Sequence, residues 1–99
     1  MLEKINLGER PDGSDGDTFE SACTKINNNF KKLSEEAKPI ILNGESSAQE
    51  RILHIYDVIK YNSELLGFNY PDLRQVVNQQ GTIKPRAVFE PIVDYFNRI

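Results

Sequence analysis

The sequence predicts a mainly α fold, in which a short extended N-terminal arm and one heptad-patterned helix precede a small bundle of two to three helices. Two observations predict it: apolar residues recur at helical spacing in several segments, and two of these segments begin with a capping box. The 99 residues suit one domain, or one domain with an attached arm. We expect an extended arm and loop over residues 1–17, an amphipathic helix over 18–37 and a small helical domain over 46–99.

The N-terminal segment combines an extended stretch with a loop. Residues 2–7 alternate loosely between apolar and polar side chains, and residues 8–17 hold three glycines and a proline, a composition typical of a loop. Asp17 is the expected N-cap of the next helix, with Glu20 three positions later completing a capping box. The helix should end before Pro39, because a proline disfavours helical geometry in the residue before it.

The first helix carries its apolar residues in a strict heptad pattern. Successive apolar residues are 4, 3, 4, 3 and 4 positions apart, as in the seam of a coiled coil; they are Phe19, Cys23, Ile26, Phe30, Leu33 and Ala37. Only about two and a half heptads are present, short of the three or four that define a coiled coil. Two interpretations therefore stay open: the helix packs on its own domain, or it associates with copies of itself.

A second helix is expected at the centre of the chain. Ser47 and Glu50 repeat the capping box, so this helix should run from Ala48 to about Leu66, with Gly67 as its C′ residue. Its wide apolar stripe indicates partners on more than one side.

Two shorter helices should follow. One is expected from Asp72 to about Asn78, ending near Gly81. Pro85 should open the last helix at its N1 position. Pro91 should kink or restart that helix, because it has no N–H for the preceding turn.

Composition and charge exclude several classes of protein. The net charge is −3 and the pI about 5.1, and no segment concentrates Lys and Arg as sequence-independent nucleic-acid binding requires. The longest apolar runs are only a few residues, too short for a membrane span, and the start lacks the apolar stretch of a signal peptide. We expect a protein made in the cytoplasm, with no nucleic-acid or membrane partner.

Candidate catalytic and metal sites are weak. Cys23 lies on the apolar seam, where burial would keep it a thiol, so a nucleophilic pair with His54 is not expected. The acidic loop imitates a calcium site, but an EF-hand starting at Asp12 needs glycine where Asp17 stands and glutamate where Cys23 stands. We therefore expect no enzyme activity, no cofactor and no metal.

A helix-turn-helix is the alternative from another class. It would centre on residues 75–81, with Arg74, Lys84 and Arg86 as phosphate contacts, but a recognition helix broken by Pro91 fits poorly. Three cations also give only a weak, salt-dependent anchor. A small DNA-binding regulator is kept as the second hypothesis.

The stretch INLGERPDGSDGDTFESACTKINNNFKKL, from residue 5 to residue 33, resembles the amino-terminal segment of many tailed-phage and prophage virion proteins, especially tail fibres and receptor-binding proteins. That family combines a short extended start, a loop rich in Gly, Pro and Asp, and a helix of the form Ala-x-x-Lys-x-Asn-x-Asn-Phe. The matching residues here are Gly16, Asp17, Thr18, Ala22, Lys25, Asn27, Asn29 and Phe30.

The resemblance implies a virion structural role near the end that attaches to the tail or baseplate, usually as a trimer. Glu20 stands where the family often has Arg, and Cys23 where it often has a larger apolar residue. Nothing after residue 40 resembles a fibre shaft or a receptor-binding head. The implied location is the virion tail, assembled in the cytoplasm of the bacterial host.

These observations lead to a hypothesis about assembly. If Cys23 and Phe30 are a positions, Asn27 and Asn29 fall at e and g, where amides could bond to neighbouring chains and fix their register. The competing interpretation is that they are exposed polar residues. We expect a homotrimer docked on other tail or baseplate proteins, with a non-viral helical interaction module as a further alternative. The expected interface consists of Phe19, Cys23, Ile26, Asn27, Asn29, Phe30 and Leu33.

Overall fold

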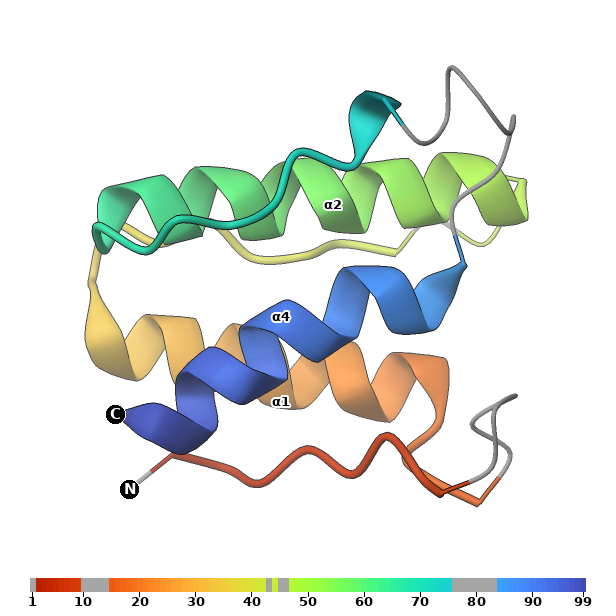
Figure 1. Ribbon diagram of the computed structural model, residues 1–99, viewed down its shortest axis with the longest axis horizontal. Helices are drawn as coiled ribbons and strands as arrows, with labels where there is room; N and C mark the ends of the chain where they lie inside the picture. The colour runs from red at the N-terminus through yellow and green to blue at the C-terminus, as the bar shows by residue number, and fades with distance from the viewer. Residues whose placement is uncertain (1, 10–14, 43, 45–46, 76–83) are drawn as a thin grey trace.

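The described structure contains three helices, extended segments before and after the first of them, and the stretch over residues 66–75 that follows the second. Figure 1 shows the computed structural model, which describes residues 2–9, 15–42, 44, 47–75 and 84–99. The helices are α1 (Phe19–Leu33), α2 (Ala48–Leu65) and α4 (Pro85–Arg98). No strand occurs within these ranges, and the prediction of a mainly helical fold is confirmed.

Helix α1 starts and ends differently from the prediction. Its N-cap is Thr18, whose hydroxyl accepts the Ser21 N–H at 3.1 Å. The prediction of Asp17 as the N-cap is wrong by one position. The Asp17 carboxylate instead binds Asn6, Ser21 and Lys25, as described below. Glu20 therefore lies in the first turn without completing a capping box; its charge there suits the helix dipole.

The helix ends at Leu33, four residues before the expected Ala37. Ser34 leaves the helix with extended backbone (φ −156°), and its N–H still donates to the carbonyl of Phe30. Its hydroxyl accepts the Glu36 N–H at 3.2 Å. Local side-chain bonding of this kind competes with helix continuation, so the chain turns before Pro39 is reached.

Helix α2 has the predicted ends. Ser47 is the N-cap and accepts the Glu50 N–H at 3.2 Å. At the other end Gly67 has a φ of +77°, a conformation that favours glycine. Its N–H donates to Glu64, and the N–H of Phe68 donates to Ser63. These two bonds form a Schellman motif, so the predicted C′ role of Gly67 is confirmed.

Helix α4 begins at Pro85, as predicted, and runs through Pro91 to Arg98 without a break. Of the two expectations for Pro91, a restart of the helix is wrong, while a kink stays a prediction. Most of the short helix expected between residues 72 and 81 lies outside the described residues.

A single apolar cluster joins all these segments. It includes Ile5 of the arm and Ile40 of the segment between α1 and α2, together with residues of the three helices. Helix α4 contacts α2 and crosses α1 in the view of Figure 1. The arm runs beside α1, so polar groups of α1 can reach its backbone. No described helix has the length and apolar character needed to cross a membrane.

Candidate functional site

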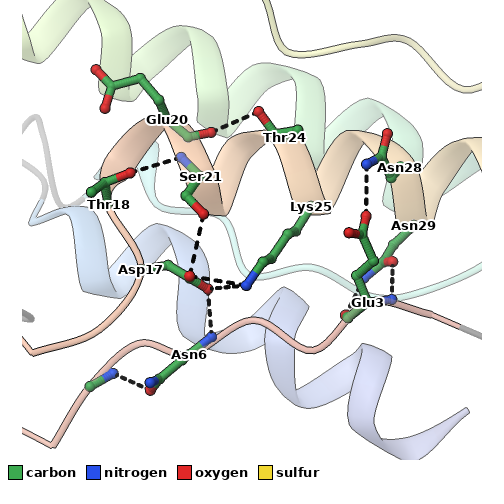
Figure 2. A network of polar contacts seen from close by, with 11 residues as sticks. Glu3, Asn6, Asp17, Thr18, Glu20, Ser21, Thr24, Lys25, Asn28 and Asn29 are labelled. Atoms are coloured by element: carbon green, nitrogen blue, oxygen red, sulfur yellow. Dashed lines mark hydrogen bonds and ion pairs between the residues drawn. The ribbon is translucent and has the colours of Figure 1, made fainter.

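Asn29 holds the N-terminal arm (residues 2–9) at Glu3 by two hydrogen bonds, as Figure 2 shows. Its carboxamide oxygen accepts the Glu3 N–H at 2.7 Å, and its amide nitrogen donates to the Glu3 carbonyl at 2.9 Å. Asn29 is fully buried. A carboxamide offers the same donor and acceptor as a peptide unit, so Asn29 pairs with the arm as a neighbouring strand would.

Asp17 holds the arm a second time, at Asn6. The N–H of Asp17 donates to the Asn6 carbonyl at 2.6 Å, and the N–H of Asn6 donates to the Asp17 carboxylate at 2.9 Å. Lys25 Nζ lies 2.9 and 3.0 Å from the two carboxylate oxygens, and the Ser21 hydroxyl donates to the same group at 3.3 Å (Figure 2). Charge-assisted bonds of this kind are stronger than neutral ones.

The charge of Asp17 depends on these partners. Partial burial raises the pKa of its carboxyl group, but the hydrogen bond from Asn6 and the hydrogen bonds and charge of Lys25 outweigh that effect. The pKa of Asp17 therefore lies below its ordinary value. The carboxylate is ionised at neutral pH and remains an acceptor for the arm.

Two glycines bring the ends of the acidic loop into contact. A Cβ on Gly16 would lie 2.5 Å from the backbone nitrogen of Gly8 and from the carbonyl carbon of Leu7. Gly8 has a φ of +81°, which side chains disfavour. Only glycine fits both positions without a shift of the backbone. We call this close approach the neck.

Helix α4 provides the third hold on the arm. The Arg86 guanidinium donates to the carbonyls of Leu7 at 3.0 Å and Gly8 at 3.3 Å, and it also pairs with Glu90. Ile5, between these anchored positions, is buried in the core. We define the arm site as Asp17, Lys25, Asn29 and Arg86.

Two further asparagines hold the connector, residues 37–42, in the same manner. Asn27 accepts the Ile40 N–H at 2.6 Å and donates to the Ile40 carbonyl at 2.9 Å. Asn62 of α2 pairs with the N–H and carbonyl of Lys38, both at 2.8 Å, and is fully buried. Asparagine lowers helix propensity, but at these positions it satisfies extended backbone that lies beside a helix.

The interface expected at Asn27 and Asn29 is therefore corrected, because both carboxamides are paired within their own chain. The expectation of exposed asparagines is also wrong for Asn29. Asn28, between them, is exposed and donates to the Glu3 carboxylate at 2.7 Å.

The heptad seam of α1 faces the interior of its own chain. Ile26 and Phe30 are fully buried and Cys23 is 3% exposed. Phe19 and Leu33 are partly buried and pack against the same core. The expectation that these five residues face partner chains is corrected by this burial.

Aromatic residues of α4 explain why the seam is covered. The ring of Phe30 meets that of Phe96 edge to face at 5.3 Å, and Phe19 meets Phe89 in the same way at 5.6 Å. Each such pair stabilises the fold by about 0.5–1.5 kcal/mol beyond the contribution of the apolar area that it buries. The first interpretation of the pattern, a helix that packs on its own domain, describes the structure.

The lone cysteine and histidine have structural partners. Burial raises the pKa of the Cys23 thiol to about 12, so the nucleophilic thiolate is scarce at neutral pH. His54 Nε2 accepts the Ile41 N–H at 3.1 Å. Across the described ranges, no three His, Cys, Asp or Glu side chains gather as a metal site; residues 12–14 of the acidic loop lie outside those ranges.

Two of the three cations considered for DNA binding are already paired. Arg74 lies 2.6 Å from a carboxylate oxygen of Asp57, and Arg86 is held by Glu90 and the arm. Lys84 is exposed. The turn expected over residues 75–81 lies outside the described residues, except for Gln75.

Sequence reasoning missed Asn62 and Arg86. Asn62 follows Ile55 by seven residues and Ile59 by three, so it is a polar residue on an apolar stripe. That position could have indicated a buried, paired amide. Arg86 had no comparable signal, because its partners are backbone carbonyls 78 and 79 residues away.

Comparisons with known proteins add no relative: no family model, curated protein or solved structure matches this chain.

Proposed function

We propose that the protein is a structural module of a tailed-phage or prophage virion, which attaches or connects a tail fibre or the baseplate by docking on other tail proteins. The observation that supports this proposal is that several residues carrying the resemblance lie together at one place in the structure, around the arm. Asp17, Lys25 and Asn29 belong to the arm site, and Gly16 closes the neck. The resemblance thus follows one three-dimensional unit, in which arm, loop and α1 depend on one another.

The use of the polar side chains also favours a structural role. Asn27, Asn29 and Asn62 each bind both backbone groups of one residue. Groups satisfied in this way fix the path of the chain and leave little capacity for a substrate. A module that presents a rigid surface to partner proteins needs side chains that fix the path of its backbone in this way.

The test is reconstitution with the products of neighbouring genes. If those genes encode tail, baseplate or fibre proteins, the chain should form a complex with at least one of them on co-expression, seen as co-elution and a matching mass by light scattering. Asn28→Ala is a suitable control, because Asn28 is exposed and its loss should leave the complex intact. Neighbouring genes of another kind, with no complex formed, would contradict the virion assignment.

DNA binding is the competing outcome to measure. Because the net charge is −3 and Arg74 and Arg86 are paired, duplex DNA should not bind measurably at physiological salt. Micromolar or tighter binding there would favour the regulator. A complex with proteins of no viral origin would favour the non-viral interaction module.

A further inference from the structure

Residues 3–8 of the arm are held by hydrogen bonds from Asp17 and from side chains of helices α1 and α4. Glu3 is bound by Asn29, Asn6 by Asp17, and the carbonyls of Leu7 and Gly8 by Arg86. Most of these contacts go to the backbone of the arm. The arm of a second copy of this chain presents the same atoms in the same order.

We propose that copies of this chain associate by exchanging N-terminal arms, so that residues 2–8 of one copy occupy the arm site of its neighbour. This inference rests on the proposed function for its biological setting, because it supplies the self-association expected of a fibre attachment module. It also avoids a difficulty: the seam of α1 is buried against α4 and offers no surface to a partner. Arm exchange needs no new surface, since it reuses contacts that already exist.

The length of the loop permits the exchange and limits its geometry. Gly8 and Gly16 touch in the closed arrangement, but the eight residue steps between them extend to about 27 Å. The molecule measures 34 × 28 × 26 Å. An arm can therefore reach a neighbour whose neck lies within that span, which requires the necks of the associated copies to lie near one another.

The hydrogen bonds are the same in the closed and exchanged arrangements, so concentration decides between them. Each copy gives one arm and receives one, so the exchanged copies can close a ring. In such a ring the site of each copy is incomplete without the arm of another. The exchanged form should therefore grow with protein concentration.

Cross-linking between two differently mutated chains tests the proposal directly. The amide nitrogen of Asn28 and a carboxylate oxygen of Glu3 lie 2.7 Å apart, so cysteines at these two positions, whose side chains are shorter, should lie within reach of a short bis-maleimide cross-linker. One chain carries Glu3→Cys and the other Asn28→Cys, both with Cys23→Ala. The two are unfolded together, refolded at high concentration and treated with the cross-linker. A covalent heterodimer is expected, because the pair can meet only if an arm crosses between copies.

A shortened loop provides the control. Deleting residues 10–14 leaves two residues between Gly8 and Gly16, enough for a tight turn, and reduces the reach to about 10 Å. This variant should stay monomeric and form no heterodimer.

A loop of unchanged length is the second control. Replacing the same five residues with Gly and Ser keeps the reach of the arm, so the heterodimer should still form. A chain with both cysteines and the shortened loop should be cross-linked internally, which shows that the pair lies within reach of the reagent.

The outcomes separate this inference from the proposed function. Absence of the heterodimer with the full-length loop, while the internal cross-link forms in the shortened chain, overturns arm exchange. If light scattering then shows oligomers, the copies associate through another surface. If it shows monomers, docking on tail proteins can still be tested by reconstitution.

Discussion

The carboxamide of Asn29 and the backbone of Glu3, 26 residues apart in sequence, are joined by hydrogen bonds of 2.7 and 2.9 Å. This relationship explains why a helix contains asparagine where an apolar residue would suit it. Within the described residues no strand lies beside the arm, so a side chain supplies the partners that its backbone needs. The asparagine stabilises the tertiary structure at the expense of helix propensity.

Replacing Asn29 by Ala should destabilise the protein by about 2–4 kcal/mol. Two hydrogen bonds are lost and the groups of Glu3 become unpaired, which outweighs a gain in helix propensity of about 0.6 kcal/mol. The matched control is Asn28→Ala, one residue away, where the exposed amide contributes little and the gain in propensity should leave stability unchanged or slightly higher. Urea unfolding of both variants checks the difference; equal effects would contradict the role of Asn29.

Phe30→Ala should cost about 3–5 kcal/mol, because it removes a fully buried ring and its contact with Phe96. The loss should be present at low concentration, where no oligomer forms, since the ring belongs to the core of each copy. Thermal unfolding over a range of dilutions measures this. A loss of stability seen only at high protein concentration would indicate that Phe30 lies at an interface between chains.

Gly16→Ala should disrupt the neck. The added Cβ would lie 2.5 Å from backbone atoms of Leu7 and Gly8, and backbone must move to relieve the clash, at a cost of about 1–3 kcal/mol. Gly44→Ala is the matched control, because a Cβ there meets nothing within 4 Å. Comparison of the two melting temperatures tests the neck. A harmless Ala at position 16 would show that the ends of the loop lie apart.

Stability should depend on pH through Asp17. Its pKa in the folded chain lies below the ordinary value of 3.8, so its contribution is present above that value and is lost as the pH falls through the folded pKa. Asp17→Asn should cost about 1–2 kcal/mol at pH 7, and the gap from the wild type should narrow below about pH 4. Urea unfolding at pH 7, 5 and 3 measures this gap. A constant gap would mean that the carboxylate does not hold the arm.

Much of the fold was predictable because its signals are local. Ser47 and Gly67 mark the ends of α2 through contacts with residues three to five positions away, and Pro85 marks the start of α4. The first helix was harder. A carboxylate at Asp17 and a hydroxyl at Thr18 both suit an N-cap. Thr18 caps the helix because the Asp17 carboxylate binds Asn6, and the position of Asn6 in space cannot be inferred from the sequence.

The candidate site was less predictable because its contacts are distant. A heptad seam looks the same whether it meets another chain or α4 of its own chain, and sequence spacing does not distinguish the two. Asn62, a polar position on an apolar stripe, did carry a signal of buried pairing, and Asn29 was expected to bond, but to neighbouring chains. Their partners, Glu3 and Lys38, carried none, since any residue has the backbone groups that the amides bind.

Hydrogen exchange at the Glu3 amide is the most direct test of the central claim, that asparagines of the helices hold the extended segments through their backbone. Glu3 lies outside any helix, so a free arm would exchange its N–H at the rate of an unstructured peptide. We expect exchange to be slower by a factor of about 100 or more in the wild type and to stay slow in Asn28→Ala. In Asn29→Ala the protection should be lost under conditions where the amides of α2 stay protected. Exchange of the wild-type Glu3 amide at the unstructured rate would contradict the central claim.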